Sequence, residues 1–370
     1  MRSISLMIKP VSGMCNMCCR YCFYADEMSR RKKKTNEPMP LELLETIVRR
    51  AFRYADGPVS FAFQGGEPTL AGLPFYEALV RFQREYNARS LPVSNSIQTN
   101  GCCLSDEMID FLAREHFLTG ISLDGIPVTH DAMRVDQKGL PTWERVTDSI
   151  RRLSRAGVSY NVLCVVNEYV AVQPEQVFRE LSMHGYLQFI TCLDDLDGIR
   201  KPWSLTSESY LGFLKTIFDL YYEAYQKGKY VSIRNFDNYI QLLAGAAPES
   251  CAMSGRCGHY YLIESDGSVY PCDFYALDEW RLGSVAEQSF HQLDRSGVGM
   301  RFRERSFPLP EQCRVCEWYL LCRNGCMRER DPVTGINRWC ECFRSFFAFS
   351  YPRMKQIALE TVKGSKEGLV

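Results

Sequence analysis

The chain has 370 residues, of which 46% are hydrophobic and 24% charged, so it is long enough to bury one large core and a smaller second one. Basic and acidic residues both number 44, a balance that gives no electrostatic reason to expect nucleic acid or an anionic membrane as a partner. Residues 1–10 lack the apolar core of a signal peptide, and no stretch approaches the roughly 18 apolar residues needed to span a bilayer, so we expect a cytoplasmic protein.

The first 230 residues alternate short apolar runs, rich in β-branched residues, with amphipathic segments. The runs predict six strands, at residues 3–9, 59–63, 92–98, 119–123, 160–166 and 188–192. The segments between and after them predict helices at residues 41–53, 74–86, 106–114, 143–156, 174–183 and 207–225. Six successive strand–helix units indicate a parallel sheet with right-handed crossovers, either doubly wound or a partial barrel. In both folds ligands gather at the carboxyl ends of the strands.

A cysteine-rich loop follows the first predicted strand. Cys15, Cys19 and Cys22 have the spacing C-x-x-x-C-x-x-C, and three thiolates on one loop can hold three irons of a four-iron cubane. The fourth iron then stays open for an exchangeable ligand, and an open position is where a metal site can do chemistry. A zinc knuckle that lacks one ligand is the structural alternative, and Cys18 creates a competing Cys15-x-x-Cys18 spacing.

Five consecutive basic residues, Arg30 to Lys34, come shortly after this loop. Such a run could be a docking patch, but it is more typical of a solvated loop. We therefore expect these side chains to be exposed.

Residues that could bind a ligand stand at or after the ends of two other predicted strands of this region, 59–63 and 119–123. Residues 65–68 read Gly-Gly-Glu-Pro, and glycine at a strand end lets the backbone approach a ligand closely. Ser122 could bond a ribose or a carboxylate, or else cap a helix. Arg134 could hold a carboxylate through its planar guanidinium, or else form a surface ion pair.

After about residue 235 the strand–helix alternation gives way to closely spaced cysteines. Residues 260–270 predict a hairpin with its turn at 265–267. Eight thiols, enough for two fully ligated four-iron clusters, stand at Cys251, Cys257, Cys272, Cys313, Cys316, Cys322, Cys326 and Cys340. Zinc is the alternative metal, because thiolate sites suit both. The apolar core of this second domain looks thin for its length, so bound metal would add stability.

Two motifs of the first region resemble the radical S-adenosylmethionine superfamily. The three-cysteine spacing followed by Phe23 and Tyr24 is similar to the signature of that superfamily, and residues 65–68 are similar to the segment that contacts the amino group of its cofactor. The eight later cysteines resemble the SPASM domain, which carries two auxiliary four-iron clusters. The resemblance implies a partial (β/α)6 TIM-like barrel at residues 1–235, a SPASM domain at 236–370, S-adenosylmethionine and three four-iron clusters.

The SPASM pattern also implies which cysteines share a cluster. The first set is Cys251, Cys257, Cys272 and Cys326, and the second set is Cys313, Cys316, Cys322 and Cys340. Cys342 could replace Cys340, although Cys340 keeps the following phenylalanines in the family register. The remaining cysteines, 18, 102, 103, 164, 192 and 342, are expected to be buried thiols without a metal.

Longer segments narrow the resemblance to the anaerobic sulfatase-maturating enzymes. Residues 5–10, 64–72, 267–275 and 280–283 are similar to segments of that family, and the stretch between Cys326 and Cys340 looks shortened. The resemblance implies oxidation of a cysteine or serine in a sulfatase to formylglycine, by abstraction of hydrogen from the β-carbon. A thioether-forming SPASM enzyme and a non-enzymatic iron–sulfur electron carrier are the competing interpretations.

The same family pattern implies roles for single residues and partners. Asp273, directly after Cys272, matches the position of the proposed base, although it could instead be a structural acceptor for backbone amides. The implied cofactor contacts are Tyr21, Gly66, Ser122, Arg134 and Leu193. The implied partners are a sulfatase polypeptide containing Cys-x-Pro-x-Arg and a flavodoxin-like or ferredoxin-like electron donor.

Overall fold

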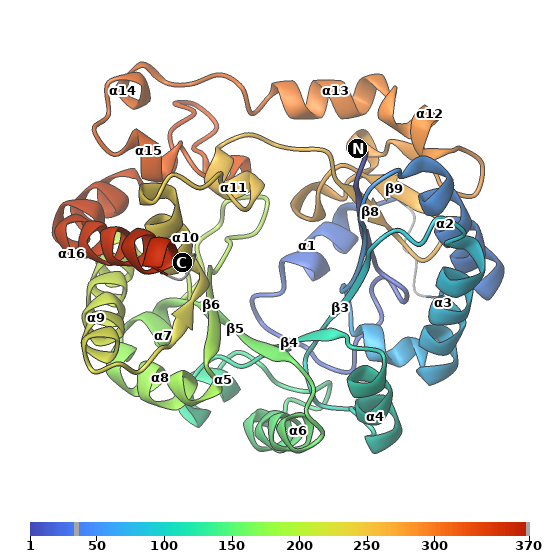
Figure 1. The fold of residues 1–370 in the computed structure, drawn as a ribbon, viewed down its shortest axis with the longest axis horizontal. Helices are drawn as coiled ribbons and strands as arrows, with labels where there is room; N and C mark the ends of the chain where they lie inside the picture. The colour runs from blue at the N-terminus through green and yellow to red at the C-terminus, as the bar shows by residue number, and fades with distance from the viewer. Residues whose placement is uncertain (33–36, 368–370) are drawn as a thin grey trace.

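The computed structural model of the chain describes residues 1–32 and 37–367, and its centre is one ten-stranded sheet. Strands β1 to β6 follow one another around an arc with helices along its outer side (Figure 1). The strands are β1 (Ile4–Ile8), β2 (Val59–Phe63), β3 (Val93–Thr99), β4 (Leu118–Ser122), β5 (Tyr160–Val166), β6 (Tyr186–Thr191), β7 (Ser232–Ile233), β8 (Tyr261–Ile263), β9 (Ser268–Tyr270) and β10 (Gly283–Ser284).

The strand order decides between the two folds that the sequence allowed. The order is β10-β9-β8-β1-β2-β3-β4-β5-β6-β7, and β1 to β7 are all parallel. Each new strand of the first region is therefore added beside the previous one, without the reversal of a doubly wound sheet. The predicted partial barrel is confirmed, with strand ends within two residues of the expected positions.

Six helices of eight to twenty residues connect the parallel strands, and all six were predicted. They are α2 (Leu41–Tyr54), α3 (Leu73–Tyr86), α4 (Asp106–Arg114), α6 (Trp143–Arg155), α8 (Pro174–Leu181) and α9 (Ser207–Gln226). Their apolar faces pack against the sheet; in α4, for example, Met108, Ile109, Phe111 and Leu112 are buried. The Ser105 hydroxyl accepts a 3.2 Å hydrogen bond from the backbone N–H of Met108, which fixes where α4 begins.

The other helices are mostly short. In the barrel region they are α1 (Phe23–Arg30), α5 (Pro127–Asp131), α7 (Glu168–Ala171) and α10 (Arg234–Leu243), with 3-10 turns at Pro68–Ala71 and Ser182–His184. In the later region they are α11 (Cys251–Ser254), α12 (Phe290–Asp294), α13 (Gly297–Glu304), α14 (Glu311–Arg314), α15 (Tyr319–Cys322) and α16 (Cys340–Glu367), with 3-10 turns at Asp273–Tyr275, Asp278–Trp280 and Met327–Glu329. Within residues 1–32 and 37–367, no helix combines the length and the apolar run that crossing a membrane requires.

The cysteine-rich region is joined to the barrel through the sheet. The predicted hairpin forms as β8 and β9, and β8 pairs in parallel with β1, so that Ile263 lies beside Ile8. The aromatic residues of α16 pack against α9 and α10, with the Phe346 ring 5.9 Å from Phe218 and 5.7 Å from Phe236. Much of the apolar surface of this region is thus buried in the barrel's core, and the division near residue 235 stays a prediction.

The predicted exposed basic run is only partly described. Lys33 and Lys34 lie outside the described residues, and Arg30 ends α1. For Arg31 the prediction is wrong, because this residue is 5% exposed and its guanidinium lies 2.9 Å from the buried carboxylate of Glu264. The local charge pattern could not predict this burial, because Glu264 follows β8 and is far from Arg31 in the sequence.

Candidate active site

The loop carrying Cys15, Cys19 and Cys22 lies beyond the carboxyl end of β1 and is held by the segment after α5. The backbone N–H of Cys18 donates to the carbonyl of Val135 at 2.8 Å, and that of Arg20 donates to Met133 at 3.0 Å. Within the loop, the N–H of Cys22 donates to the carbonyl of Cys19 at 3.2 Å. These backbone hydrogen bonds hold the loop in place, and the Cys15 Sγ also accepts from the N–H of Met17 at 3.4 Å.

The three thiols of this loop are close enough to affect one another's ionisation. Burial raises the pKa of Cys15 to about 11 and that of Cys19 to about 12, and the charge of Cys22 raises both further. Cys18 belongs to neither interaction. It is exposed, as is Cys103, so the expectation that these two thiols are buried is wrong. The set supplies three mutually close thiols that would release their protons on binding metal, which fits a cluster held through three of its irons.

The Gly-Gly-Glu-Pro segment contacts the cysteine loop directly. Gly66 has a φ of 51°, and a Cβ on it would lie 2.1 Å from the carbonyl oxygen of Met14. The N–H of Glu67 donates to that same carbonyl at 2.8 Å. Gly66 is therefore required for the close approach of two backbone segments, one of which carries Cys15. Its predicted cofactor contact stays a prediction.

Glu67 is a buried carboxylate that the sequence interpretation passed over. It is 1% exposed and accepts hydrogen bonds from the Thr99 hydroxyl at 2.7 Å and from the backbone N–H of Asn100 at 2.8 Å. The Asn100 amide in turn donates to Asn16, beside Cys15, at 2.7 Å. Glu67 thus ties the end of β2 to the end of β3 and, through Asn100, to the cysteine loop.

A second buried carboxylate, Asp124, organises two of the predicted cofactor contacts. Asp124 is fully buried and accepts hydrogen bonds from the Tyr21 hydroxyl, from Arg134 Nε at 2.9 Å and from the N–H of Val165 at 2.9 Å. Arg134 is only 7% exposed, so it is not the surface ion pair that was the alternative. Among the described residues, nothing accepts from its two Nη groups, which could meet a further carboxylate.

His130 holds the backbone of both Asp124 and Arg134 in place, the second through Thr142. Its Nδ1 accepts from the N–H of Asp124 at 3.2 Å, and its Nε2 lies 3.0 Å from the Thr142 hydroxyl, which donates to the carbonyl of Arg134. Burial lowers the pKa of His130 to about 4, so the ring is neutral and fits these roles with the proton on Nε2.

The last two predicted cofactor contacts lie at strand ends on the same edge of the sheet. Ser122 is the final residue of β4 and is 6% exposed. Leu193 comes two residues after β6, on a loop that leaves the sheet edge. All five predicted contacts therefore lie on loops or strand ends at the carboxyl edge of the barrel, where parallel sheets bind ligands.

Asp273, the predicted base, is buried between two barrel side chains. Its Oδ1 lies 2.7 Å from Lys9 Nζ, and its Oδ2 accepts from Gln64 Nε2 at 2.6 Å. Lys9 follows β1, Gln64 follows β2, and Asp273 follows β9, so all three elements meet here. These bonds are to side chains, not to the backbone amides of the structural alternative.

A buried group of charges surrounds this carboxylate, and the sequence interpretation did not identify it. Lys9 is 1% exposed and lies 3.3 Å from the centre of the Tyr24 ring. Glu27 is 2% exposed, and neither of its carboxyl oxygens has a hydrogen-bond partner among the described residues. Burial raises the pKa of Glu27 to about 8, Lys9 lowers it and Asp273 raises it. Glu27 is therefore largely protonated at neutral pH.

The first predicted auxiliary set is also brought together. The pKa of Cys326 is raised to about 12, first by burial, and the charges of Cys251 and Cys257 add to this. Burial raises the pKa of Cys272 well above its usual value, and Cys326 and Cys257 raise it further. These four thiols come from three separate segments, two of which flank the hairpin, and one of them, Cys272, directly precedes Asp273.

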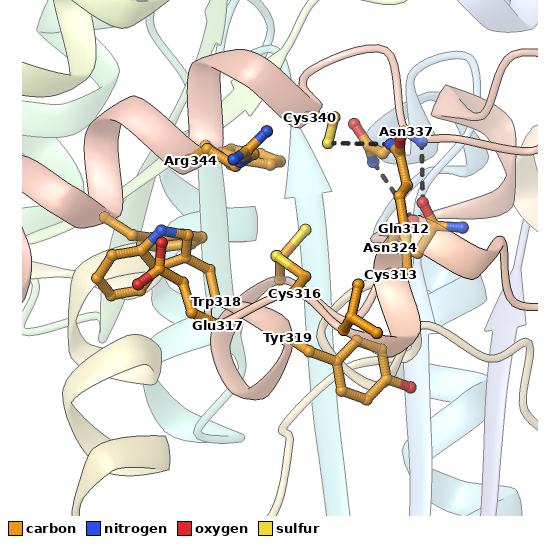
Figure 2. A pocket seen from close by; sticks show the side chains of 14 residues that line it. Gln312, Cys313, Cys316, Glu317, Trp318, Tyr319, Asn324, Asn337, Cys340 and Arg344 are labelled. Atoms are coloured by element: carbon orange, nitrogen blue, oxygen red, sulfur yellow. Dashed lines mark hydrogen bonds between the residues drawn. The ribbon is translucent and has the colours of Figure 1, made fainter.

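The second predicted set lines a cavity of about 310 Å³ at the surface. All four predicted thiols, Cys313, Cys316, Cys322 and Cys340, are in its lining. Figure 2 shows Cys316 and Cys340 facing one another across it. Burial raises the pKa of Cys322 to about 12, and the charges of the other three thiols raise it further.

Cys342, the alternative to Cys340, faces elsewhere. It is 2% exposed, belongs to the apolar core and affects the pKa of Tyr210 on α9 and of Tyr239 on α10. In a helix, residues two apart point in nearly opposite directions, so α16 can present only one of the two cysteines to the cavity. The geometry favours Cys340.

The thiol sets differ from a site for a single metal ion. Across residues 1–32 and 37–367, no three Cys, His, Asp or Glu side chains are gathered tightly enough to hold one metal ion. In a cubane each thiolate binds a different iron, so the ligands do not converge on one point.

Comparison with protein families matches both regions. Residues 10–180 match the radical SAM superfamily, and residues 251–317 match the iron–sulfur cluster-binding domain named SPASM. The first match covers the cysteine loop and the carboxyl ends of β2 to β5, and the second covers five of the eight later thiols.

Individual relatives extend the match to nearly the whole chain. A cysteine-type anaerobic sulfatase-maturating enzyme of Clostridium novyi strain NT is 42% identical, over 97% of this chain and 98% of the relative. A serine-type enzyme of Bacteroides thetaiotaomicron is 30% identical, over 95% of this chain and 91% of the relative. The solved structure of native anSMEcpe with bound AdoMet and Cp18Cys peptide superposes with a TM-score of 0.93 at 38% identity, over 97% of this chain and all of that one. The chain therefore belongs to the family of anaerobic sulfatase-maturating enzymes.

Proposed function

We propose that this protein oxidises a cysteine of a sulfatase polypeptide to formylglycine. The observation that carries the proposal is the position of Asp273, a buried carboxylate held by Lys9 and Gln64 next to a cysteine of the first auxiliary set. A simple electron carrier has no need of a buried carboxylate beside a loop built for an open cluster. The similarity over nearly the whole chain to a cysteine-type maturating enzyme supports the same conclusion.

The residues of the barrel edge fit the cofactors of this family. Cys15, Cys19 and Cys22 would hold a four-iron cluster, and Tyr21, Gly66, Ser122, Arg134 and Leu193 would surround S-adenosylmethionine. When bound, these two groups supply a 5'-deoxyadenosyl radical that removes a hydrogen atom from the substrate's β-carbon. The free Nη groups of Arg134 suit the carboxylate of S-adenosylmethionine, and Asp124 fixes the orientation of that guanidinium.

Asp273 would accept the proton of the substrate thiol. Lys9 and Gln64 hold one carboxylate oxygen each, which fixes the plane of the carboxylate and keeps lone pairs available for an O···H–S contact. Loss of one hydrogen atom, one proton and one electron converts the CH2SH group to a thioaldehyde, and water then replaces sulfur to give the aldehyde and hydrogen sulfide. The electron would leave through the auxiliary clusters, to which Cys272, beside Asp273, belongs.

The two auxiliary sets would each hold one closed four-iron cluster. In the proposed division, residues 236–370 form the SPASM domain and residues 1–235 the radical-generating barrel. The surface cavity of the second set suggests where electrons could pass to or from a flavodoxin-like or ferredoxin-like partner. All seventeen cysteines are free thiols in the structure, and such chemistry suits a reducing compartment, so we infer that the enzyme works in the cytoplasm.

The test is an anaerobic reaction of the iron-reconstituted protein with reductant, S-adenosylmethionine and a peptide containing Cys-x-Pro-x-Arg. Mass spectrometry should find an aldehyde in place of the cysteine thiol, together with 5'-deoxyadenosine. A serine peptide serves as comparison and should react more slowly if the enzyme is of the cysteine type. Deoxyadenosine without any change in either peptide would favour another SPASM reaction, such as thioether formation, and would contradict the proposal.

A further inference from the structure

The loop after β6 is held by residues that lie more than 130 positions later in the chain. This loop, residues 191–197, contains Leu193. The Thr191 hydroxyl donates to Glu329 Oε1 at 2.5 Å, and the carbonyl of Asp194 accepts from Arg328 Nη2 at 2.7 Å. The carboxylate of Asp194 pairs with Arg338 Nη1 at 2.8 Å. Three polar contacts thus bracket Leu193.

All three partners lie in one short segment, residues 327–339, between two cysteines of different auxiliary sets. Cys326 precedes the segment and belongs to the first set, and Cys340 follows it and belongs to the second. The segment is internally braced, because the N–H of Arg338 donates to the carbonyl of Glu329 at 2.8 Å and Trp339 Nε1 donates to the Glu329 carboxylate at 2.8 Å. It can therefore act as one unit.

The loop's other end is attached to the helix that follows the cysteine loop. The N–H of Leu196 donates to the Asp26 carboxylate at 2.8 Å, and Asp197 lies 3.6 Å from Arg30. Both Asp26 and Arg30 belong to α1, which begins directly after Cys22. The loop thus spans the space between the N-terminal cysteine loop and the auxiliary cysteines.

We propose that Arg338 is a positioning residue that holds the Leu193 loop in the conformation that binds S-adenosylmethionine, and so couples the auxiliary-cluster segment to cofactor binding. The inference rests on the proposed function, which assigns Leu193 to the cofactor. Arg338 is suited to the task because its guanidinium also covers the Trp339 ring at 4.4 Å, which restricts its rotamers. Asp194 is 12% exposed at its side chain, so loss of its partner leaves a poorly solvated carboxylate beside Leu193.

The experiment measures the dissociation constant of S-adenosylmethionine by anaerobic equilibrium dialysis with iron-reconstituted protein, at matched iron content. Arg338→Gln should weaken binding about tenfold, the size expected for a partly buried hydrogen bond between charged groups. Arg338→Lys keeps the charge and should restore part of the affinity. Asp194→Asn should also weaken binding, and adding it to Arg338→Gln should cost little more, because both remove the same pair.

Arg353→Gln is the matched control. Arg353 pairs with Asp219 at 2.6 Å, its side chain is 27% exposed against 26% for Arg338, and it also covers aromatic rings, but it joins α16 to α9 away from the loop. Arg353→Gln should lose less thermal stability than Arg338→Gln, because Asp219 is 53% exposed and stays solvated without its partner. Only Arg338→Gln should change the dissociation constant. Equal dissociation constants for wild type and Arg338→Gln, or equal losses in Arg338→Gln and Arg353→Gln, would overturn the inference. Failure of the wild type itself to bind S-adenosylmethionine would instead remove the proposed function on which the inference rests.

Discussion

The barrel region and the cysteine-rich region are held together in different ways. In the barrel, consecutive parallel strands and helices of eight to twenty residues satisfy the backbone and bury continuous apolar faces. Between residues 251 and 340 the helices have four to eight residues, and side chains bond many loop carbonyls. Arg330 alone donates to the carbonyls of Gly255, Ser306, Asn324 and Gly325. The barrel should therefore fold without metal, whereas the later loops should depend on it.

The largest expected effect comes from removing a cluster thiol. Cys272→Ala should lose the iron of the first auxiliary set and loosen the loops around residues 251–257 and 326, because the cluster would join those segments. Cys164→Ala, a 1% exposed thiol on β5, should keep all iron and cost about 1 kcal/mol in the free energy of unfolding. Iron content and anaerobic thermal unfolding measure both variants. Equal iron in the two would show that Cys272 holds no metal.

Within the barrel, adding one methyl group at Gly66 should disturb the cysteine loop and leave the fold intact. Gly66→Ala must push the carbonyl of Met14 aside, since its Cβ would lie 2.1 Å from that oxygen. Gly139→Ala has a similar positive φ, 76°, but nothing within 4 Å, so it should cost only about 1–2 kcal/mol. Production of 5'-deoxyadenosine should fall sharply in the first variant and stay near wild type in the second. Similar activity in both would mean that the loop tolerates the shift.

The loops of the cysteine-rich region should respond to loss of one guanidinium. Arg330→Met removes donors from four carbonyls and should cost about 2–4 kcal/mol. In Arg152→Met the barrel loses bonds to the Leu104 carbonyl and to Asp106, at an exposed end of α6, and should change less. Hydrogen exchange should show faster opening of residues 251–340 in the first variant, with the barrel strands still protected. Uniform loss of protection would mean that the two regions unfold as one.

The smallest effect depends on pH. Burial raises the pKa of Glu27 to about 8, so the folded chain keeps a proton that the unfolded chain loses near pH 4.5. Wild-type stability should therefore fall as pH rises between those values, and Glu27→Gln should remove that loss. The advantage of the variant should grow by on the order of 2 kcal/mol from pH 5 to pH 8.5, by denaturant unfolding. Glu175→Gln, exposed on α8, should show no such trend.

The sequence predicted the elements that have a local pattern and missed the contacts between residues far apart in the chain. The six barrel strands and their helices have clear periods, and the hairpin has its turn residues, so local patterns located them. The pairing of β8 with β1 joins residues about 250 positions apart, and no local pattern encodes it. The burial of Arg31 and the roles of Lys9, Glu67 and Asp124 depend on partners brought in by that topology.

Cysteine spacing was informative because three thiols on one loop and eight thiols in the later region recur at intervals that suit the ligands of four-iron clusters. The choice between Cys340 and Cys342 required the helix α16, whose turn directs one of them to the cavity and the other to the core. Strand β7 was not predicted, because two residues carry too little pattern, and the ten-residue helix α10 that begins directly after it was missed as well.

The central claim is that the barrel generates the radical while the cysteine-rich region contributes the base. The most direct test is the ratio of formylglycine to 5'-deoxyadenosine in Asp273→Asn, with Asp278→Asn, an exposed neighbour, as control. The account predicts that Asp273→Asn still cleaves S-adenosylmethionine but that the ratio falls at least about a hundredfold, the usual contribution of a positioned base. An unchanged ratio in Asp273→Asn, with both variants carrying full iron, would contradict it.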